Sequence, residues 1–186
     1  MAAQERESAP RLTQLTRPGE VTSALRGNLV DCWVTVSNAG GAVIPYGFPL
    51  PPVTARQVGP VLDQVVQELH PQRCRMLVAT VEGELAGWLL LRRDQHPLVA
   101  HCGVVNHVQT HPRFRRLGIG AALMRRVRDV ARDDMGLERL GLGARAGLGL
   151  EVFYRRLGWL EVGRWPGALR VAPGDDRDEI LMSLTL

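Results

Sequence analysis

The segment from Arg115 to Ala121 has the composition of a phosphate-binding turn. It reads Arg-Arg-Leu-Gly-Ile-Gly-Ala and lies between a predicted strand and a predicted helix. The first turn of a helix has backbone N–H groups without internal acceptors, and the helix dipole adds positive charge there. Gly118 and Gly120 let a ligand approach this backbone, and the arginines can form charge-assisted hydrogen bonds to phosphate oxygens. The segment therefore predicts an anion cradle, with a tight strand-to-helix joint as the structural alternative.

Two common phosphate-binding loops do not match this segment. A Walker loop requires a lysine, whereas all 23 basic residues of this chain are arginine. A dinucleotide-binding fingerprint requires glycine or alanine at the position of Leu123, and it normally follows the first strand of the chain. The predicted cradle lies in the middle of the chain instead.

The charge of the chain does not by itself indicate a nucleic-acid partner. The formal net charge is +4, and the arginines concentrate between residues 113 and 132. There is no aromatic platform beside them on which bases could stack, since the chain has only three phenylalanines and two tyrosines. We therefore expect no nucleic-acid partner, and we interpret Arg125, Arg126 and Arg128 as a solvated helix face.

Strands and helices mix along the chain in the order of an α+β (α/β-type) fold around one mixed sheet. Apolar periodicity and turn residues predict strands over residues 12–16, 76–81, 85–91, 99–110, 137–142, 159–163 and 179–184. Helices are predicted to begin near Pro18 and near residues 54–60, where Thr54 and Gln57 have capping-box spacing and Pro60 is expected to mark the start. Two further helices are predicted to cover residues 113–132 and 148–156. We expect residues 10–186 to form a single domain and residues 1–9 to be a flexible terminus.

The stretch from Cys32 to Ala55 contains no charged residue and includes four prolines. Proline and glycine exclude one continuous helix here. The stretch is either a long loop packed on the surface or a loop that covers a substrate.

Cysteine content and hydropathy indicate the cellular setting. The three cysteines, Cys32, Cys74 and Cys102, are far apart, which indicates buried free thiols rather than disulfides or a metal site. No apolar segment is long enough to span a membrane, and the first residues lack the apolar core of a signal peptide. We expect a cytoplasmic protein that binds neither metal nor membrane.

Two motifs together resemble the GNAT superfamily of acetyltransferases. The first is His111-Pro112-x-x-Arg115-x-x-Gly118-x-Gly120-Ala121, which resembles the coenzyme A signature of that family. The second follows some thirty residues later and reads Phe153-Tyr154-Arg155-Arg156-Leu157-Gly158-Trp159. The resemblance is strongest over residues 99–165 and weak before residue 70.

The resemblance implies a GNAT-like fold and acetyl-CoA as co-substrate. The expected fold is a mixed, mostly antiparallel sheet, flanked by helices and splayed between two central strands at residues 104–110 and 137–142. The pantetheine arm would pair with exposed strand backbone, and the pyrophosphate would bind the cradle. The implied binding residues are Val108, Gln109, Thr110, Arg115, Arg116, Leu117, Gly118, Ile119, Gly120 and Ala121. Arg113 or a later arginine would meet the 3′-phosphate.

The resemblance also implies direct attack of a neutral amine on the thioester, with Tyr154 as general acid to the leaving sulfur. The structural alternative is that Tyr154 only packs and orients the thioester. The glutamate that serves some members as base aligns with Val104, so the base is elsewhere or is water. His107 titrates in a useful range, but strand alternation places it opposite Val104, Asn106 and Val108. Asn106 can orient substrate or water but cannot act as a base.

The acceptor is predicted to be a primary amine of a small molecule. Trp33, Tyr46 and Asn106 are the candidate substrate contacts, with Phe48 and Trp165 as further aromatic candidates and core packing as the alternative. Three other interpretations remain open: a protein or peptide amine as acceptor, a non-catalytic acyl-CoA-binding module, and a homodimer.

Overall fold

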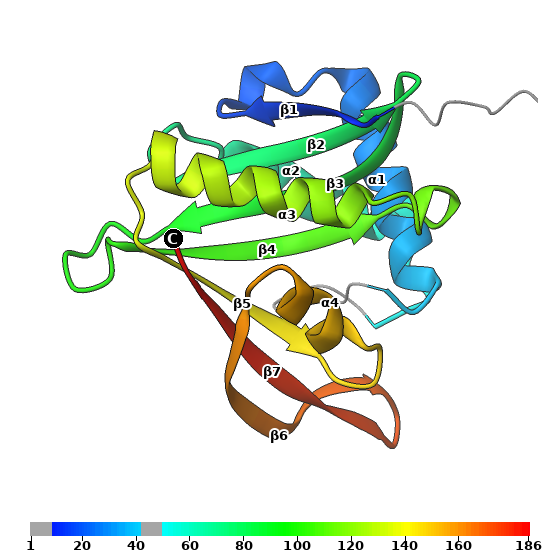
Figure 1. The fold of residues 1–186 in the computed structure, drawn as a ribbon. Helices are drawn as coiled ribbons and strands as arrows, with labels where there is room; N and C mark the ends of the chain where they lie inside the picture. The colour runs from blue at the N-terminus through cyan, green and yellow to red at the C-terminus, as the bar shows by residue number, and fades with distance from the viewer. Residues whose placement is uncertain (1–8, 42–49) are drawn as a thin grey trace, which may run out of the picture.

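The protein is built on one seven-stranded sheet (Figure 1). The computed structural model describes residues 9–41 and 50–186. The strands are β1 (Arg11–Leu15), β2 (Cys74–Val81), β3 (Glu84–Arg93), β4 (Cys102–Thr110), β5 (Arg139–Arg145), β6 (Leu160–Ala172) and β7 (Asp175–Thr185). Their order across the sheet is β1-β2-β3-β4-β5-β7-β6, and only the β4–β5 pair is parallel. The predicted mixed, mostly antiparallel sheet is therefore confirmed.

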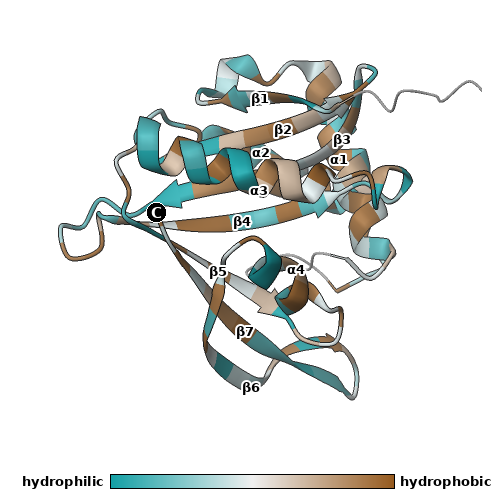
Figure 2. Cartoon of the chain, viewed as in Figure 1, coloured by the Kyte–Doolittle hydropathy of each residue, from teal (hydrophilic) through white to brown (hydrophobic). Residues whose placement is uncertain are grey.

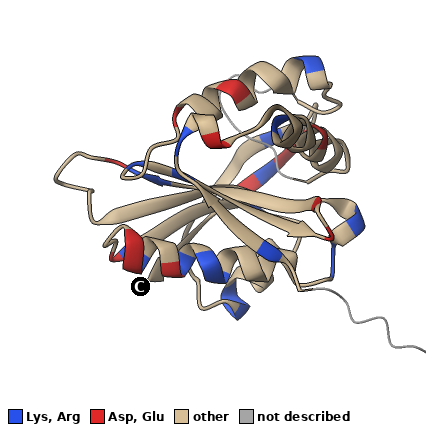
Figure 3. Cartoon of the chain, turned by 90° about the horizontal axis from the view of Figure 1, so that it is seen from above, with Lys and Arg blue, Asp and Glu red and all other residues tan. Residues whose placement is uncertain are grey.

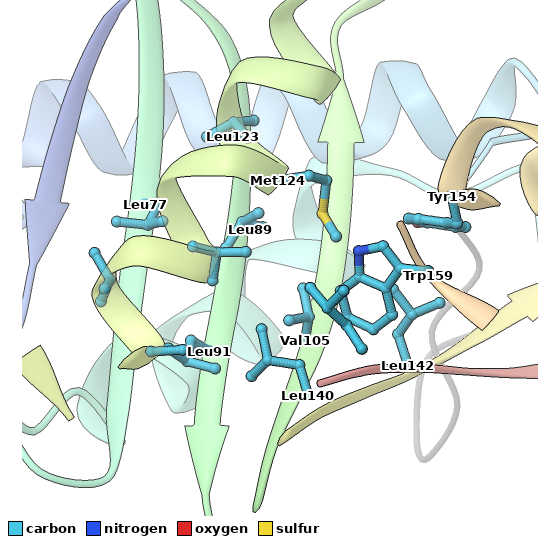
Figure 4. Packing of buried hydrophobic residues seen from close by; sticks show 14 of the residues in the cluster. Leu77, Leu89, Leu91, Val105, Leu123, Met124, Leu140, Leu142, Tyr154 and Trp159 are labelled. Atoms are coloured by element: carbon cyan, nitrogen blue, oxygen red, sulfur yellow. The ribbon is translucent and has the colours of Figure 1, made fainter. Parts of the chain in front are cut away.

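Helices cover both faces of the sheet. They are α1 (Ser23–Asn38), α2 (Ala55–Gln67), α3 (Ile119–Asp129) and α4 (Leu150–Arg156). One buried cluster lies under α3 and α4, and Figure 4 shows part of it, with Leu89 and Leu91 of β3 below Leu123 of α3. A second cluster joins α1 and α2 to the opposite face of β2 and β3. The colouring in Figure 2 shows the outer side of α3 as hydrophilic, as expected for a helix that buries only one stripe.

Local sequence signals explain where the helices begin. The side chain of Thr22 accepts a hydrogen bond from the N–H of Leu25 at 3.2 Å, which caps α1. At the start of α2, the N–H of Thr54 donates to Oε1 of Gln57 at 3.0 Å, in the predicted capping box. The two predicted helices are thus confirmed, although a short 3-10 turn (Pro18–Glu20) precedes α1. The start expected at Pro60 is wrong, because Pro60 lies inside α2, which begins at Ala55.

The predicted helix over residues 113–132 is shorter than expected. A 3-10 turn (Pro112–Phe114) comes first, and α3 begins only at Ile119. Arg116 and Gly118 have φ values of 67° and 75°, in the left-handed region, so the segment before Ile119 cannot be α-helical. After Asp129 the chain continues as a π-helical turn (Val130–Asp134).

Several strand predictions also had wrong limits. The strand predicted from residue 99 begins at Cys102, because Val99 belongs to a turn in which the N–H of Cys102 donates to the C=O of Val99 at 2.9 Å. The last two strands are longer than predicted and form a hairpin, with Trp165 paired opposite Glu179. Much of β6 is exposed, so it lacks the apolar alternation by which sequence reveals a strand.

The uncharged stretch is helical at its beginning. Residues 33–38 belong to α1, so the loop predicted from Cys32 to Ala55 starts after Asn38. Tyr46 and Phe48 lie outside the described residues, as does the predicted flexible terminus before Ala9. Within residues 9–41 and 50–186, no helix has the length and apolar content of a membrane span.

Candidate active site

The central strands separate after a short parallel contact. β4 and β5 pair only at Cys102–Arg139, Gly103–Leu140 and Val104–Gly141. Beyond Val104 the two strands diverge, with α4 beside the open end (Figure 1). The second strand of the splay is Arg139–Arg145, slightly later than the predicted residues 137–142. The edge of β4 that faces away from β3 is therefore available to an amide-bearing ligand over Val105 to Thr110.

The predicted cradle lies at the end of this open edge. The first helical hydrogen bond runs from the N–H of Ala122 to the C=O of Gly118 at 2.9 Å. The N–H groups of Ile119, Gly120 and Ala121 precede this first donor and therefore have no acceptor within the helix. Gly118 adopts the left-handed conformation at the N-cap, with open space around its Cα, so ligand atoms can reach these amides. This geometry fits the pyrophosphate of a coenzyme A thioester.

The arginines around the cradle differ in their partners. Nη1 of Arg113 is 2.8 Å from Oε2 of Glu84, so Arg113 is paired within the protein. Arg115 and Arg116 are exposed, and within the described part of the chain neither pairs with a carboxylate. Their guanidiniums remain available to phosphate oxygens. Figure 3 shows most of the charged residues along the helices and fewer on the strands of the sheet.

Packing brings the two sequence motifs together. A Cβ at Gly120 would lie 3.3 Å from Cζ of Phe153 and 3.5 Å from Oγ1 of Thr110. The first turn of α3 is therefore in close contact with both the end of β4 and helix α4. Tyr154 follows Phe153 directly, so the candidate general acid lies on the element that borders the cradle.

Tyr154 is a buried residue at the end of the core. Its side chain is 6% exposed, and its ring centroid is 5.1 Å from that of Phe153 and 6.0 Å from that of Trp159. Figure 4 shows Tyr154 and Trp159 beside Met124 and Leu142. Burial raises the pKa of the Tyr154 phenol well above its ordinary value. The phenol is therefore protonated at neutral pH and can donate a hydrogen bond.

His107 lies opposite Val108, as predicted, but its predicted place opposite Asn106 is wrong. His107 has a φ of 54°, and the register with β3 shifts between Trp88 and Leu90. Because this bulge interrupts the alternation, His107 lies on the same face as Asn106. Its ring centroid is 4.9 Å from Trp33 and 5.2 Å from Trp88, beneath α1.

His107 is poorly suited to be the general base. Burial, with a contribution from Arg92, lowers the pKa of His107 to about 3. Its Nδ1 has no hydrogen-bond partner among the described residues. A histidine with this pKa is neutral at pH 7 and accepts a proton only weakly.

The burial of His107 predicts a pH-dependent stability. The pKa of His107 is lower in the folded protein than its ordinary value of 6.5. The stability that comes from the neutral, buried His107 is therefore fully present above pH 6.5 and is lost progressively as the pH falls toward 3. We expect the unfolding free energy to fall by about 1.4 kcal/mol per pH unit below 6.5 from this group. Urea unfolding at pH 7 and pH 5 measures the effect. His107→Asn should reduce the slope, whereas His101→Asn, at an exposed position, should leave most of it; equal slopes in both variants would contradict the assignment.

Val104 stands at the position that aligns with the glutamate base of some family members, and its neighbour on β3 is the basic residue Arg92. Val104 is 47% exposed, and its partner on β3 is Arg92. Nη1 of Arg92 donates to Oδ1 of Asn106 at 3.3 Å, and its Nη2 lies 2.8 Å from Oε2 of Glu68. Sequence reasoning did not identify Arg92 as a site residue. It directly follows the apolar run of the predicted strand over residues 85–91, and this position was the signal that could have identified it. The bond to Arg92 leaves the amide N–H groups of Asn106 as donors.

The aromatic substrate candidates are dispersed. Trp33 is fully buried in the core, in contact with Trp88 at a centroid distance of 5.4 Å, so it offers no surface to a solute. Trp165 is 66% exposed on β6. Asn106 is the candidate substrate residue that lies at the splay. The described residues contain no cluster of three or more histidine, cysteine or acidic side chains that could hold a metal.

Comparison with known proteins places the chain in a family. Residues 48–159 match the model of the acetyltransferase (GNAT) family. The chain therefore belongs to the GNAT acetyltransferase family, which confirms the resemblance seen in its two motifs. The family uses acetyl-CoA, in agreement with the cradle and the open strand edge.

One curated relative shares part of the sequence. A mycothiol acetyltransferase from Mycolicibacterium vanbaalenii is 42% identical over 83 residues, which is 44% of this chain. The match spans 26% of the length of that relative.

Solved structures share the fold over nearly the whole chain. A ribosomal-protein-alanine N-acetyltransferase from Brucella melitensis has a TM-score of 0.72 at 18% identity, covering 95% of this chain and 99% of that one. A Salmonella typhimurium protein solved with its cofactor acetyl-CoA has a TM-score of 0.69 at 16% identity, covering 96% and 95%.

Proposed function

We propose that this protein transfers the acetyl group of acetyl-CoA to a primary amine of a small molecule, with Tyr154 as general acid. The observation that carries the proposal is the convergence of the cradle and Tyr154 on the opening between β4 and β5. A ligand with a pyrophosphate at one end and a thioester at the other matches this arrangement.

Binding would use backbone and charge at different parts of the same ligand. The amides of Ile119, Gly120 and Ala121 would hold the pyrophosphate, with Arg115 and Arg116 supplying charge. The backbone of Val108, Gln109 and Thr110 would pair with the pantetheine amides along the open strand edge. The thioester would then lie beside α4.

The reaction forms one C–N bond and breaks one C–S bond. The amine nitrogen attacks the thioester carbon, and the sulfur leaves with the electron pair of the C–S bond. The Tyr154 hydroxyl donates a hydrogen bond and then its proton to that sulfur. Burial raises the pKa of Tyr154, so the phenol carries its proton at neutral pH when the sulfur leaves. Removal of water from around the thioester would likewise disfavour a free thiolate and so favour its protonation.

Loss of a proton from the acceptor ammonium would proceed through water. Asn106 cannot take a proton, His107 is too weak a base, and Val104 has no ionisable group. The guanidinium of Arg92 lies next to Val104 in the sheet. Because Glu68 pairs with this guanidinium, Arg92 adds little net charge beside the acceptor, and water remains the proposed proton acceptor.

The name of the relative from Mycolicibacterium vanbaalenii, a mycothiol acetyltransferase, supports a small-molecule acceptor. The name of the Brucella melitensis structure, a ribosomal-protein-alanine N-acetyltransferase, supports a protein acceptor. We favour the small molecule because the sequence identity is higher with the mycothiol acetyltransferase, at 42% over 83 residues, than with the Brucella protein, at 18%.

Incubation with acetyl-CoA and a panel of primary amines tests the proposed function. We expect amine-dependent release of the coenzyme A thiol, with the acetylated amine identified by mass spectrometry. Acetyl-CoA binding without release across the panel would instead indicate a non-catalytic acyl-CoA-binding module. Transfer only to peptide N-termini would replace the small molecule by a protein acceptor.

A further inference from the structure

A cavity of about 310 Å³ lies where α1, β5 and the β6–β7 hairpin meet. Its lining includes Asn38, Arg145, Gly147, Leu148, Asp175 and Arg177. Arg145 and Gly147 belong to the end of β5 and the connection to α4, so the cavity adjoins the strand that borders the splay. The volume is at the lower end of the range for small-molecule sites, roughly 300–1,000 Å³.

The charged groups of this cavity are two guanidiniums and one carboxylate. Arg177 and Asp175 form a bidentate pair, with Nη2 of Arg177 3.0 Å from Oδ2 of Asp175. Arg145 has no acidic hydrogen-bond partner among the described residues; its Nη2 donates to the C=O groups of Gly40 and Gly41. The described lining of the cavity therefore carries one excess positive charge.

The excess charge arises at Arg145, whose nearby counter-charge, Asp175, is already paired with Arg177. Burial and the neighbouring Arg177 lower the pKa of Arg145, against a smaller opposing effect of Asp175, so the charge of Arg145 is disfavoured in this place. Within the part of the chain that the structure describes, its Nε and Nη1 have no acceptor. An anion in the cavity would supply both the acceptor and the missing charge.

Gly147 maintains the position of the second guanidinium. A Cβ at Gly147 would lie 2.5 Å from Nη1 of Arg177, so any larger residue would displace the arginine. The φ of Gly147 is 88°, which also favours glycine. The connection after β5 thus leaves room for Arg177 at the cavity.

The cavity and the cradle approach the splay from different sides. The cradle is at the start of α3, on the face that α3 and α4 cover, whereas the cavity includes the end of α1, which packs on the opposite face. An acceptor held in the cavity would therefore not compete with acetyl-CoA for space.

We propose that Arg145 and Arg177 bind a carboxylate of the acceptor, so that the substrate is a small amine that also carries a carboxylate group. This inference rests on the proposed function and specifies its substrate class. A single excess charge suits a carboxylate better than a phosphate dianion, and a planar guanidinium matches the two carboxylate oxygens.

Binding of acetylated products tests the inference without relying on turnover. N-acetylalanine and N-acetylalaninamide differ only in the carboxylate, and their Kd values are measured by calorimetry with the full-length protein. We expect the carboxylate form to bind roughly 10- to 100-fold more tightly, the range of a charge-assisted hydrogen bond. Arg177→Gln and Arg145→Gln should each remove most of this preference. Equal binding of the two compounds to the unmodified protein would overturn the inference.

The matched control is Arg170→Gln. Arg170 forms a similar bidentate pair with Asp176 on the same hairpin but does not line the cavity. The control should retain the preference; if it loses the preference as Arg177→Gln does, the carboxylate does not bind at the cavity. Thermal stabilisation by acetyl-CoA, measured on every variant, shows that each one is folded.

Acetyl transfer to alanine and to alaninamide separates this inference from the proposed function. We expect alanine to be preferred, even though the carboxylate makes its amine more basic and so less often neutral. Transfer to alaninamide at an equal or higher rate would contradict the carboxylate site while supporting the acetyltransferase. Tighter binding of N-acetylalanine with no transfer to any amine would support the carboxylate site and contradict the proposed function.

Discussion

Replacing Gly118 by glutamate is expected to raise the Kd for acetyl-CoA by roughly 100-fold or more, corresponding to about 2.7 kcal/mol. Gly118 is the N-cap of α3 and has a φ of 75°. A glutamate there places a carboxylate among amides and arginines that the pyrophosphate would otherwise contact. The measurement is thermal unfolding with and without acetyl-CoA, because a ligand that binds only the folded protein raises its Tm.

The control for this prediction is Gly174→Glu, which introduces the same backbone strain and the same negative charge as Gly118→Glu. Gly174 has a φ of 77° and, like Gly118, has no atom within 4 Å of a Cβ position. Gly174→Glu in the β6–β7 turn therefore introduces the same backbone strain, roughly 1–2 kcal/mol, and the same carboxylate away from the cradle. Both variants should unfold at a lower temperature than the original protein, but only Gly118→Glu should lose stabilisation by acetyl-CoA. Loss in both, or in neither, would contradict a phosphate site at residues 115–120.

Replacing Tyr154 by phenylalanine is expected to reduce kcat by roughly 100- to 1,000-fold, within the range of general acid catalysis. The ring remains, so packing against Phe153 and Trp159 is preserved. We expect the Kd for acetyl-CoA to change little, because the phosphate and strand contacts lie elsewhere. Steady-state kinetics combined with thermal shifts measures both quantities.

The pH dependence distinguishes donation from packing. Burial raises the pKa of Tyr154, so the phenol remains protonated through pH 10 and should cause no alkaline loss of activity below that value. Because the pKa of Tyr154 is raised by folding, its contribution to the free energy of unfolding is fully present below pH 10 and is lost only at higher pH. Phe153→Leu, a change to the adjacent packing residue, is the comparison. If it lowers kcat as much as Tyr154→Phe, the tyrosine acts by packing alone.

Local sequence was sufficient for the features that depend on local backbone. The cradle follows from Gly118 and Gly120 before an amphipathic helix, since helix N-termini bind anions wherever they occur. The capping box at Thr54 was likewise predicted and is present, and the strands predicted over residues 76–81 and 85–91 form the hairpin of β2 and β3. A helix was predicted over residues 148–156, and α4 (Leu150–Arg156) contains the Phe153-Tyr154 part of the second motif.

Other features could not be obtained from sequence because they depend on distant partners. Strand alternation wrongly placed His107 opposite Asn106, since a bulge against β3 is a property of the pair rather than of either strand. Trp33 was a substrate candidate, but packing with Trp88 buries it completely. The length of β6 was underestimated because this strand is defined by its pairing with β7 and not by an apolar pattern in its sequence.

The sequence by itself determined the family motifs, the mixed sheet and the place of the phosphate cradle, because short-range spacing encodes each of them. Only the tertiary structure decided where β4 and β5 separate, which face His107 occupies, and that Arg145 and Arg177, 32 residues apart in sequence, line one cavity. These outcomes depend on contacts between residues far apart in the chain. The register of a sheet and the burial of a charge are set by those contacts rather than by neighbouring residues.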